Sequence, residues 1–124
     1  MRTIEKLAAL AWILLVAGCG HVAITDAGAG LRAAPRAGDC EVAFFRTKLP
    51  ERAYDELAAL HWEGPGAWST AGGAQEDMRS CACRVGADAV VVTRDYFPGT
   101  QHSAATMTGS AIRYRPAATA AAKP

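Results

Sequence analysis

The chain has no large excess of charge of either sign and no internal repeat. Its 124 residues carry 13 Lys and Arg against 12 Asp and Glu, which gives a formal net charge of +1. Binding to nucleic acid usually requires basic residues gathered in excess on one face, so we do not expect nucleic acid as a partner. The hydrophobic fraction of 51% excludes a wholly disordered or collagenous chain, and the length allows one small domain.

Sequence motifs for catalysis and for binding phosphate or metal are also lacking. The chain has no glycine-rich phosphate loop, no Ser nucleophile elbow, no His-Glu-x-x-His sequence and no Cys-x₂-Cys pair. Glu51, Asp55 and Glu56 form a small carboxylate cluster, but Arg52 among them favours an ordinary solvated surface. We therefore expect a protein that is not an enzyme and that has no catalytic residues and no cofactor.

The sequence opens with a basic and then an apolar stretch. Arg2 and Lys6 precede an apolar run at residues 7–17, and small residues follow it at once. As a helix this run would be roughly 17 Å long, well short of the ~30 Å hydrocarbon core of a membrane. The pattern is typical of a secretory signal peptide at residues 1–18 rather than of a membrane-spanning helix.

The end of this stretch, Leu-Val-Ala-Gly-Cys at residues 15–19, resembles the lipobox of bacterial lipoproteins very closely. In that family the cysteine thiol receives a diacylglyceryl group, the signal peptide is cleaved before it, and the new amine is acylated. The resemblance implies that Cys19 is the lipidated first residue of the mature chain and anchors it in a membrane. Gly20, at a position where Asp would imply retention in the inner membrane, implies the periplasmic side of the outer membrane. The alternatives are an uncleaved anchor helix or an ordinary secretory signal in which Cys19 is incidental.

Two segments of simple composition flank the middle of the chain. Residues 19–38 hold the lipidated N terminus and an Ala- and Gly-rich stretch without apolar periodicity, which predicts a flexible tether. Residues 116–124 form an Ala-rich tail with proline at both ends, which predicts disorder. The predicted domain is residues 39–115, and a core of that size often needs a covalent staple.

The domain has the sequence patterns of an α+β fold. Its clearest strand signals are segments that are rich in β-branched and aromatic residues or that alternate, at residues 41–46, 88–97 and 106–114. A helix is predicted over residues 74–85, with Gly86 as its stop signal. At 100° per residue, Met78, Ala82 and Val85 lie within about 60° of arc, so this stripe should face the sheet.

Residues 52–62 give an ambiguous signal. Their Glu, Ala and Leu content, with Leu57 and Leu60 three residues apart, favours a helix. A strand would instead place Leu57, Ala59 and His61 on one face, which is a weaker pattern.

Three motifs of the domain are Tyr-Asp-Glu-Leu at residues 54–57, Val-Gly-Ala-Asp-Ala-Val-Val at residues 85–91 and Gly-Ser-Ala-Ile at residues 109–112. Together they resemble the small domain of the Rcs-type stress-sensing outer-membrane lipoproteins and of related small lipoproteins. The resemblance implies a small antiparallel sheet of about four strands with one helix packed across it, and it implies that residues 52–62 form a strand. The stress sensor has cysteines near its last two strands, and this chain has none there.

The remaining cysteines predict one disulfide. With Cys19 assigned to lipid, Cys40, Cys81 and Cys83 leave one thiol over in an oxidising compartment. Helix geometry favours Cys81 as the partner of Cys40, because it lies about 60° from Met78 and borders the buried stripe. The family resemblance implies Cys83 instead, so we expect Cys40–Cys83, with Cys81 as the second choice.

Two hypotheses for function follow. In the first, the chain is a non-enzymatic, membrane-anchored domain that binds another envelope protein or senses the state of the envelope. Trp62 and Trp68 flank a Gly-Pro-Gly loop and are the expected partner-binding residues. In the second, Cys40, Cys81 and Cys83 form a thiol-based metal-binding or redox module. Because two cysteines spaced as Cys-x-Cys on a helix point about 200° apart, no metal site is expected.

Overall fold

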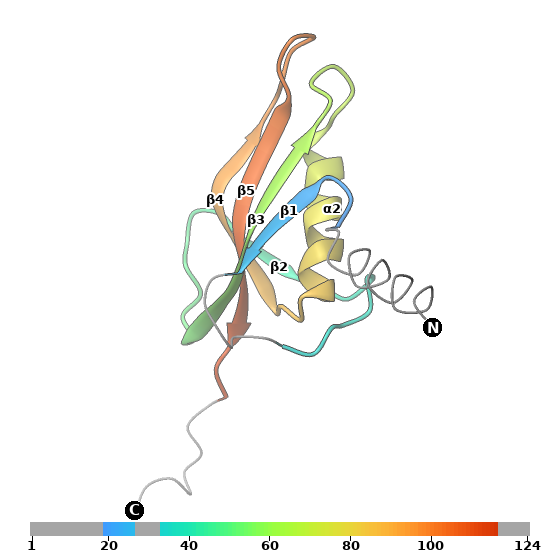
Figure 1. Ribbon diagram of the computed structural model, residues 1–124. Coiled ribbons are helices and arrows are strands. Elements are labelled where there is room, and N and C mark those ends of the chain that lie inside the picture. Colours follow the sequence, from blue (N-terminus) through green and yellow to red (C-terminus); the bar gives the residue numbers. More distant parts are fainter. Residues whose placement is uncertain (1–18, 27–32, 117–124) are drawn as a thin grey trace, which may run out of the picture.

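The computed structural model describes residues 19–26 and 33–116, and in this part of the chain a sheet has a helix packed on one face (Figure 1). The elements in chain order are β1 (Val22–Asp26), β2 (Ala43–Phe45), β3 (Tyr54–Gly64), α2 (Ala71–Arg84), β4 (Ala89–Phe97) and β5 (Ala105–Tyr114). The predicted α+β class is confirmed. The predicted signal peptide and nearly all of the predicted tail lie outside the described residues. No helix in the described part is both long and apolar enough to cross a membrane.

The sheet has five strands in the order β1-β3-β5-β4-β2. All neighbouring strands are antiparallel except β2 and β4, which are parallel. The prediction of a purely antiparallel sheet of about four strands is therefore wrong in both respects. The parallel pair follows from a disulfide between Cys40 and Cys83, which brings the chain before β2 to the end of α2. Both strands start from that point, and Ala43 consequently pairs with Ala89.

The fifth strand, β1, lies inside the predicted flexible tether. That prediction is wrong for Val22–Asp26, which pair with β3 along its outer edge. Val22 is almost completely buried and Ile24 packs against the core, so two apolar residues in alternation supply the inward face. So short a strand is stable only when the backbone of β3 provides its hydrogen-bonding partners.

Strand β3 occupies the ambiguous region, so the strand that the family resemblance implies there is confirmed from Tyr54 onward, and the helix favoured by composition is wrong. A register shift between Glu56 and Ala58 marks a β-bulge, and Leu57 and Ala58 are both buried there. Beyond the bulge the alternation resumes, with Leu60 inside and His61 exposed. The bulge therefore interrupts the period of two that would have identified the strand from its sequence.

Helix α2 begins three residues before its predicted start. The Thr70 hydroxyl accepts a hydrogen bond of 3.0 Å from the Gly73 amide and caps the first turn. The predicted stop at Gly86 is confirmed, because this glycine has a φ of +80° directly after the C-cap Val85.

The inward face of α2 packs on the middle of the sheet. Met78 and Ala82 are fully buried, as the predicted stripe requires. Met78 lies over Gly109 of β5, where an added Cβ would be 3.1 Å from the Met78 Cε atom. The absence of a side chain at Gly109 therefore lets the helix approach the sheet closely.

Candidate partner-binding site

The two tryptophans predicted to bind a partner have opposite environments. Trp62 in β3 is only 4% exposed, and its indole Nε1 donates a hydrogen bond of 2.8 Å to the Asp77 carboxylate of α2. Its predicted partner-binding role is therefore wrong, because both its ring and its polar atom are used inside the domain. Trp68, in the loop between β3 and α2, is 85% exposed.

The loop that carries Trp68 is held by local hydrogen bonds. The Ser69 amide donates to the Pro65 carbonyl over 3.1 Å, and the Ser69 hydroxyl donates to the same oxygen. Thr70 then caps α2. Trp68 therefore projects from a loop that is fixed at both ends by the strand and the helix.

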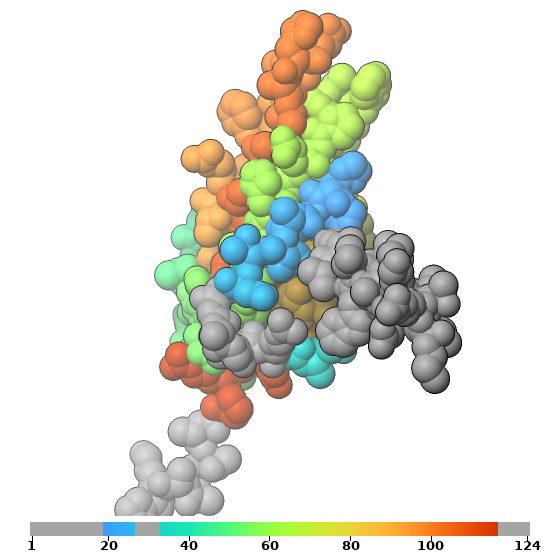
Figure 2. All heavy atoms as spheres, in the orientation of Figure 1, coloured from blue at the N-terminus to red at the C-terminus, as the bar shows by residue number. Residues whose placement is uncertain are grey.

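A second loop, the tip of the β4–β5 hairpin at residues 98–104, lies beside this one at the same end of the molecule (Figure 2). Its turn is closed by a bond of 2.9 Å from the Thr100 amide to the Ser103 carbonyl. Gly66 joins the two loops, because a Cβ on this residue would overlap the carbonyl oxygens of both Thr100 and Ser103. The contact between the two loops is therefore made by backbone atoms of both loops.

The two loops enclose a groove of about 600 Å³. It is lined by residues 63–68 and 100–104, and most of its surface is apolar. Glu63 and His102 are the two ionisable residues in this lining, and Trp68 forms part of the wall. A groove of this kind fits an uncharged, partly apolar segment of a partner better than a charged one.

Substituting Gly66 by alanine should separate the two loops. The new methyl group has no room, so we expect amide hydrogen exchange in residues 98–104 to become about tenfold faster through easier local opening. Gly72→Ala is the matched control, because a Cβ there meets nothing within 4 Å. Equal exchange rates for Gly66→Ala and the unmodified protein would contradict this contact.

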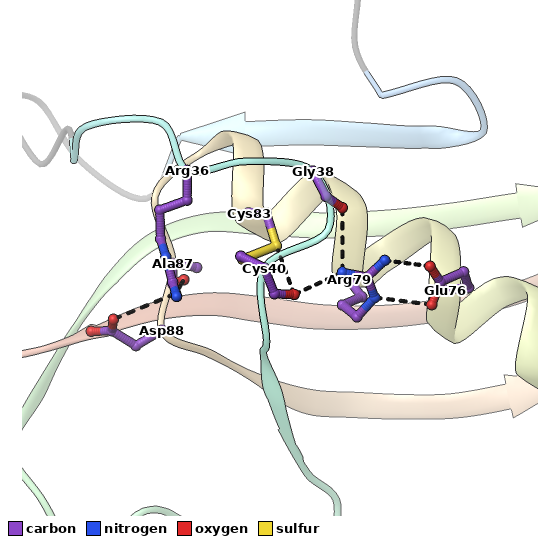
Figure 3. Close-up of a disulfide and its surroundings, with 8 residues drawn as sticks. All are labelled: Arg36, Gly38, Cys40, Glu76, Arg79, Cys83, Ala87 and Asp88. Carbon is purple, nitrogen blue, oxygen red and sulfur yellow. Dashed lines mark hydrogen bonds and ion pairs between the residues drawn. A yellow bond between two sulfur atoms is a disulfide. The ribbon is translucent and has the colours of Figure 1, made fainter.

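A disulfide at the far end of α2 holds the segment of residues 33–40, which we call the strap (Figure 3). Cys40 is bonded to Cys83, the partner that the family resemblance implied, with 5.8 Å between the Cα atoms. The Arg36 guanidinium donates to the Ala87 carbonyl over 2.9 Å, and that of Arg79 donates to the Cys40 carbonyl over 2.7 Å. The strap is therefore fixed by the disulfide and by charge-assisted hydrogen bonds from both arginines.

Arg79 also binds Glu76 one turn earlier on the helix (Figure 3). The hydrogen bond from this guanidinium lowers the pKa of the Glu76 carboxyl, and the same bond raises the pKa of Arg79. The pair consequently stays ionised to more acidic pH than an isolated glutamate would allow.

Cys81, the second choice as partner of Cys40, is bonded to Cys19. The two Cα atoms are 5.4 Å apart, and Cys81 is fully buried beneath the start of β1. All four cysteines of the described residues are thus in disulfides. This pairing leaves no free thiol among the described cysteines to bind a metal ion, and the described part of the chain holds no group of three or more His, Cys, Asp or Glu placed to bind one.

Comparison with protein-family models, with curated proteins and with solved structures found no match to this chain.

Proposed function

We propose that the chain is a lipid-anchored lipoprotein of the bacterial envelope whose small domain binds another envelope protein and catalyses no reaction. The lipobox at residues 15–19 supports acylation of Cys19. Gly20 after it favours the periplasmic side of the outer membrane as the location. The resemblance to the Rcs-type lipoproteins supports an envelope protein as the partner, in sensing or in assembly.

The observation that carries the binding role is the exposure of Trp68 beside the groove. A tryptophan that is 85% exposed leaves a large apolar ring in water, and such rings are enriched among residues that dominate protein interfaces. The hydrogen bonds of the loop restrict the backbone that carries this ring, so less backbone entropy is lost when a partner covers it.

In the disulfide-bonded form of the domain, Cys19 and the loop of Trp68 lie at different turns of α2. Cys19 is bonded to Cys81, whereas the loop of Trp68 leads into the first turn of α2. Ten residues of helix between Ala71 and Cys81 correspond to roughly 15 Å.

Metabolic labelling with an alkyne fatty acid tests the anchor. The full chain, expressed with its own leader in a bacterium, should be labelled and recovered with membranes. Cys19→Ala should lose the label completely, because the acceptor sulfur is absent. Cys40→Ala is the control and should keep it. Label that persists in Cys19→Ala would refute the lipoprotein assignment.

Photo-crosslinking from position 67 tests the groove. We expect a specific adduct with an envelope protein, and Trp68→Ala should reduce it about tenfold or more, as loss of an interface hot spot does. Leu49→Ala is the matched control, because Leu49 is also an exposed apolar residue, at 61%, but does not line the groove. Equal adduct yields for the two variants would argue against the groove as the binding site.

A further inference from the structure

The residue proposed to carry the lipid is also one half of a disulfide. Cys19 is followed by a tight turn in which the Val22 amide donates to the Cys19 carbonyl over 3.0 Å. Gly20 has a φ of +59° in this turn, which directs Cys19 back toward the helix. The sulfur of Cys19 thereby meets that of Cys81, which is completely buried in α2.

The two covalent states of Cys19 exclude one another. In lipidation, the Cys19 thiol attacks a glyceryl carbon of a diacylglyceryl phospholipid, a C–S bond forms, and the thiol proton is lost. The carbon–oxygen bond to the phosphate headgroup breaks, and the headgroup leaves with the electron pair. In oxidation, Cys19 and Cys81 together lose two protons and two electrons. A protein disulfide of the thiol-oxidase class accepts them and becomes two thiols.

We propose that Cys81 competes with the lipid donor for the sulfur of Cys19. Lipidation then has to precede the docking of Cys19 and β1 on α2, and the lipidated domain retains Cys81 as an unpaired thiol. A chain that folds and is oxidised first is closed to lipidation. This inference rests on the proposed function, since it assumes that Cys19 is the acceptor of the lipid.

The geometry limits the competition to Cys81. The other helix cysteine, Cys83, is bonded to Cys40 and completes the attachment of the strap without Cys19. In the lipidated chain, no cysteine of the described residues would remain to pair with Cys81. The absence of exposed surface on Cys81 belongs to the disulfide-bonded state, in which Cys19 covers its sulfur.

Lipidation should also loosen the beginning of β1. The disulfide is the covalent link between this segment and α2. Without it, β1 is held by its pairing with β3 and by burial of Val22. The turn at Gly20 would then open, because a Cys19 sulfur that carries acyl chains into a bilayer cannot also be directed at Cys81.

The test combines fatty-acid labelling with thiol counting on the full chain, expressed with its own leader. Labelled and unlabelled chains are separated, denatured without reductant and treated with a maleimide reagent. We expect one reactive thiol in each labelled chain and none in each unlabelled chain. Cys81→Ala should raise the labelled fraction, and Arg84→Ala, at an exposed position of the same helix, is the control that should leave it unchanged.

The outcomes separate the two proposals. Two results together would overturn the competition while the lipid anchor stands. They are a labelled fraction that does not change in Cys81→Ala, and a reactive Cys81 thiol in unlabelled chains. The complete absence of label from every variant would refute the anchor, and the competition with it. The thiol count on the unmodified protein does not depend on whether Cys81→Ala folds.

Discussion

Replacing Cys40 and Cys83 together by alanine is expected to lower the free energy of unfolding by about 4 kcal/mol. The disulfide closes a loop with a sequence separation of 43, and removing it releases the entropy of that loop in the unfolded chain. It also frees the strap from α2 and removes the contact that starts β2 beside β4. Urea unfolding under non-reducing conditions, followed by circular dichroism, measures the change.

Reductant supplies the control for this result. In the protein without lipid, the Cys19–Cys81 bond is also present, so reductant should destabilise it further than the double substitution does. An unfolding midpoint that is the same for the unmodified protein and the double variant without reductant would show that the Cys40–Cys83 bond is not formed in solution.

Met78→Ala should reduce the free energy of unfolding by about 2–5 kcal/mol, the range for truncating a large core side chain. Met78 has no exposed surface and fills the space that Gly109 leaves open on the sheet. Gly109 has no side chain that could move into the cavity that the substitution creates, and the side chain of Val90 borders the same space. The same urea titration measures the loss.

Arg84→Ala provides the comparison on the same helix. Arg84 is exposed in the last turn of α2, and a surface change of this type is expected to alter stability by no more than about 0.5 kcal/mol. A loss below about 1 kcal/mol for Met78→Ala would mean that the helix does not pack on the sheet at Gly109 as described.

The sequence was most informative where a local signal and the tertiary contact agree. Gly86 ends the helix because its left-handed conformation is a local requirement, and it could be recognised from sequence. Met78 and Ala82 could be placed on the buried face because helical periodicity alone brings them together. These features depend little on residues that are distant in the sequence.

The errors occurred where distant segments determine the local structure. Strand β1 contains too few apolar residues to be recognised without its partner β3, and the bulge after Glu56 conceals the alternation of β3. Trp62 and Trp68 have the same local signal, a tryptophan beside a Gly-Pro-Gly loop. Only the fold distinguishes the one that reaches Asp77 from the one that faces solvent.

The groove and the cysteine pairing also depend on contacts that the sequence alone does not reveal. Pro98 and Gly99 indicate a turn, but no sequence signal places that turn against Gly66. Helical angles favoured Cys81 as the partner of Cys40 and contained no information on the direction from which the strap approaches. The lipobox assigns Cys19 to lipid and contains no information on its proximity to Cys81.

The order of the strands determines when each strand pairing can form while the chain is being synthesised. Both edge strands, β1 and β2, precede the three central strands in the sequence, so each is synthesised before the strand that it pairs with. Val22, for example, has no pairing partner until Trp62 has been made. Contacts so distant in sequence form late, because the intervening loop must first be closed. Cys19, the first cysteine of the described chain, is therefore accessible and unpaired for a time. The length of that time depends on the rate at which the rest of the polypeptide is synthesised.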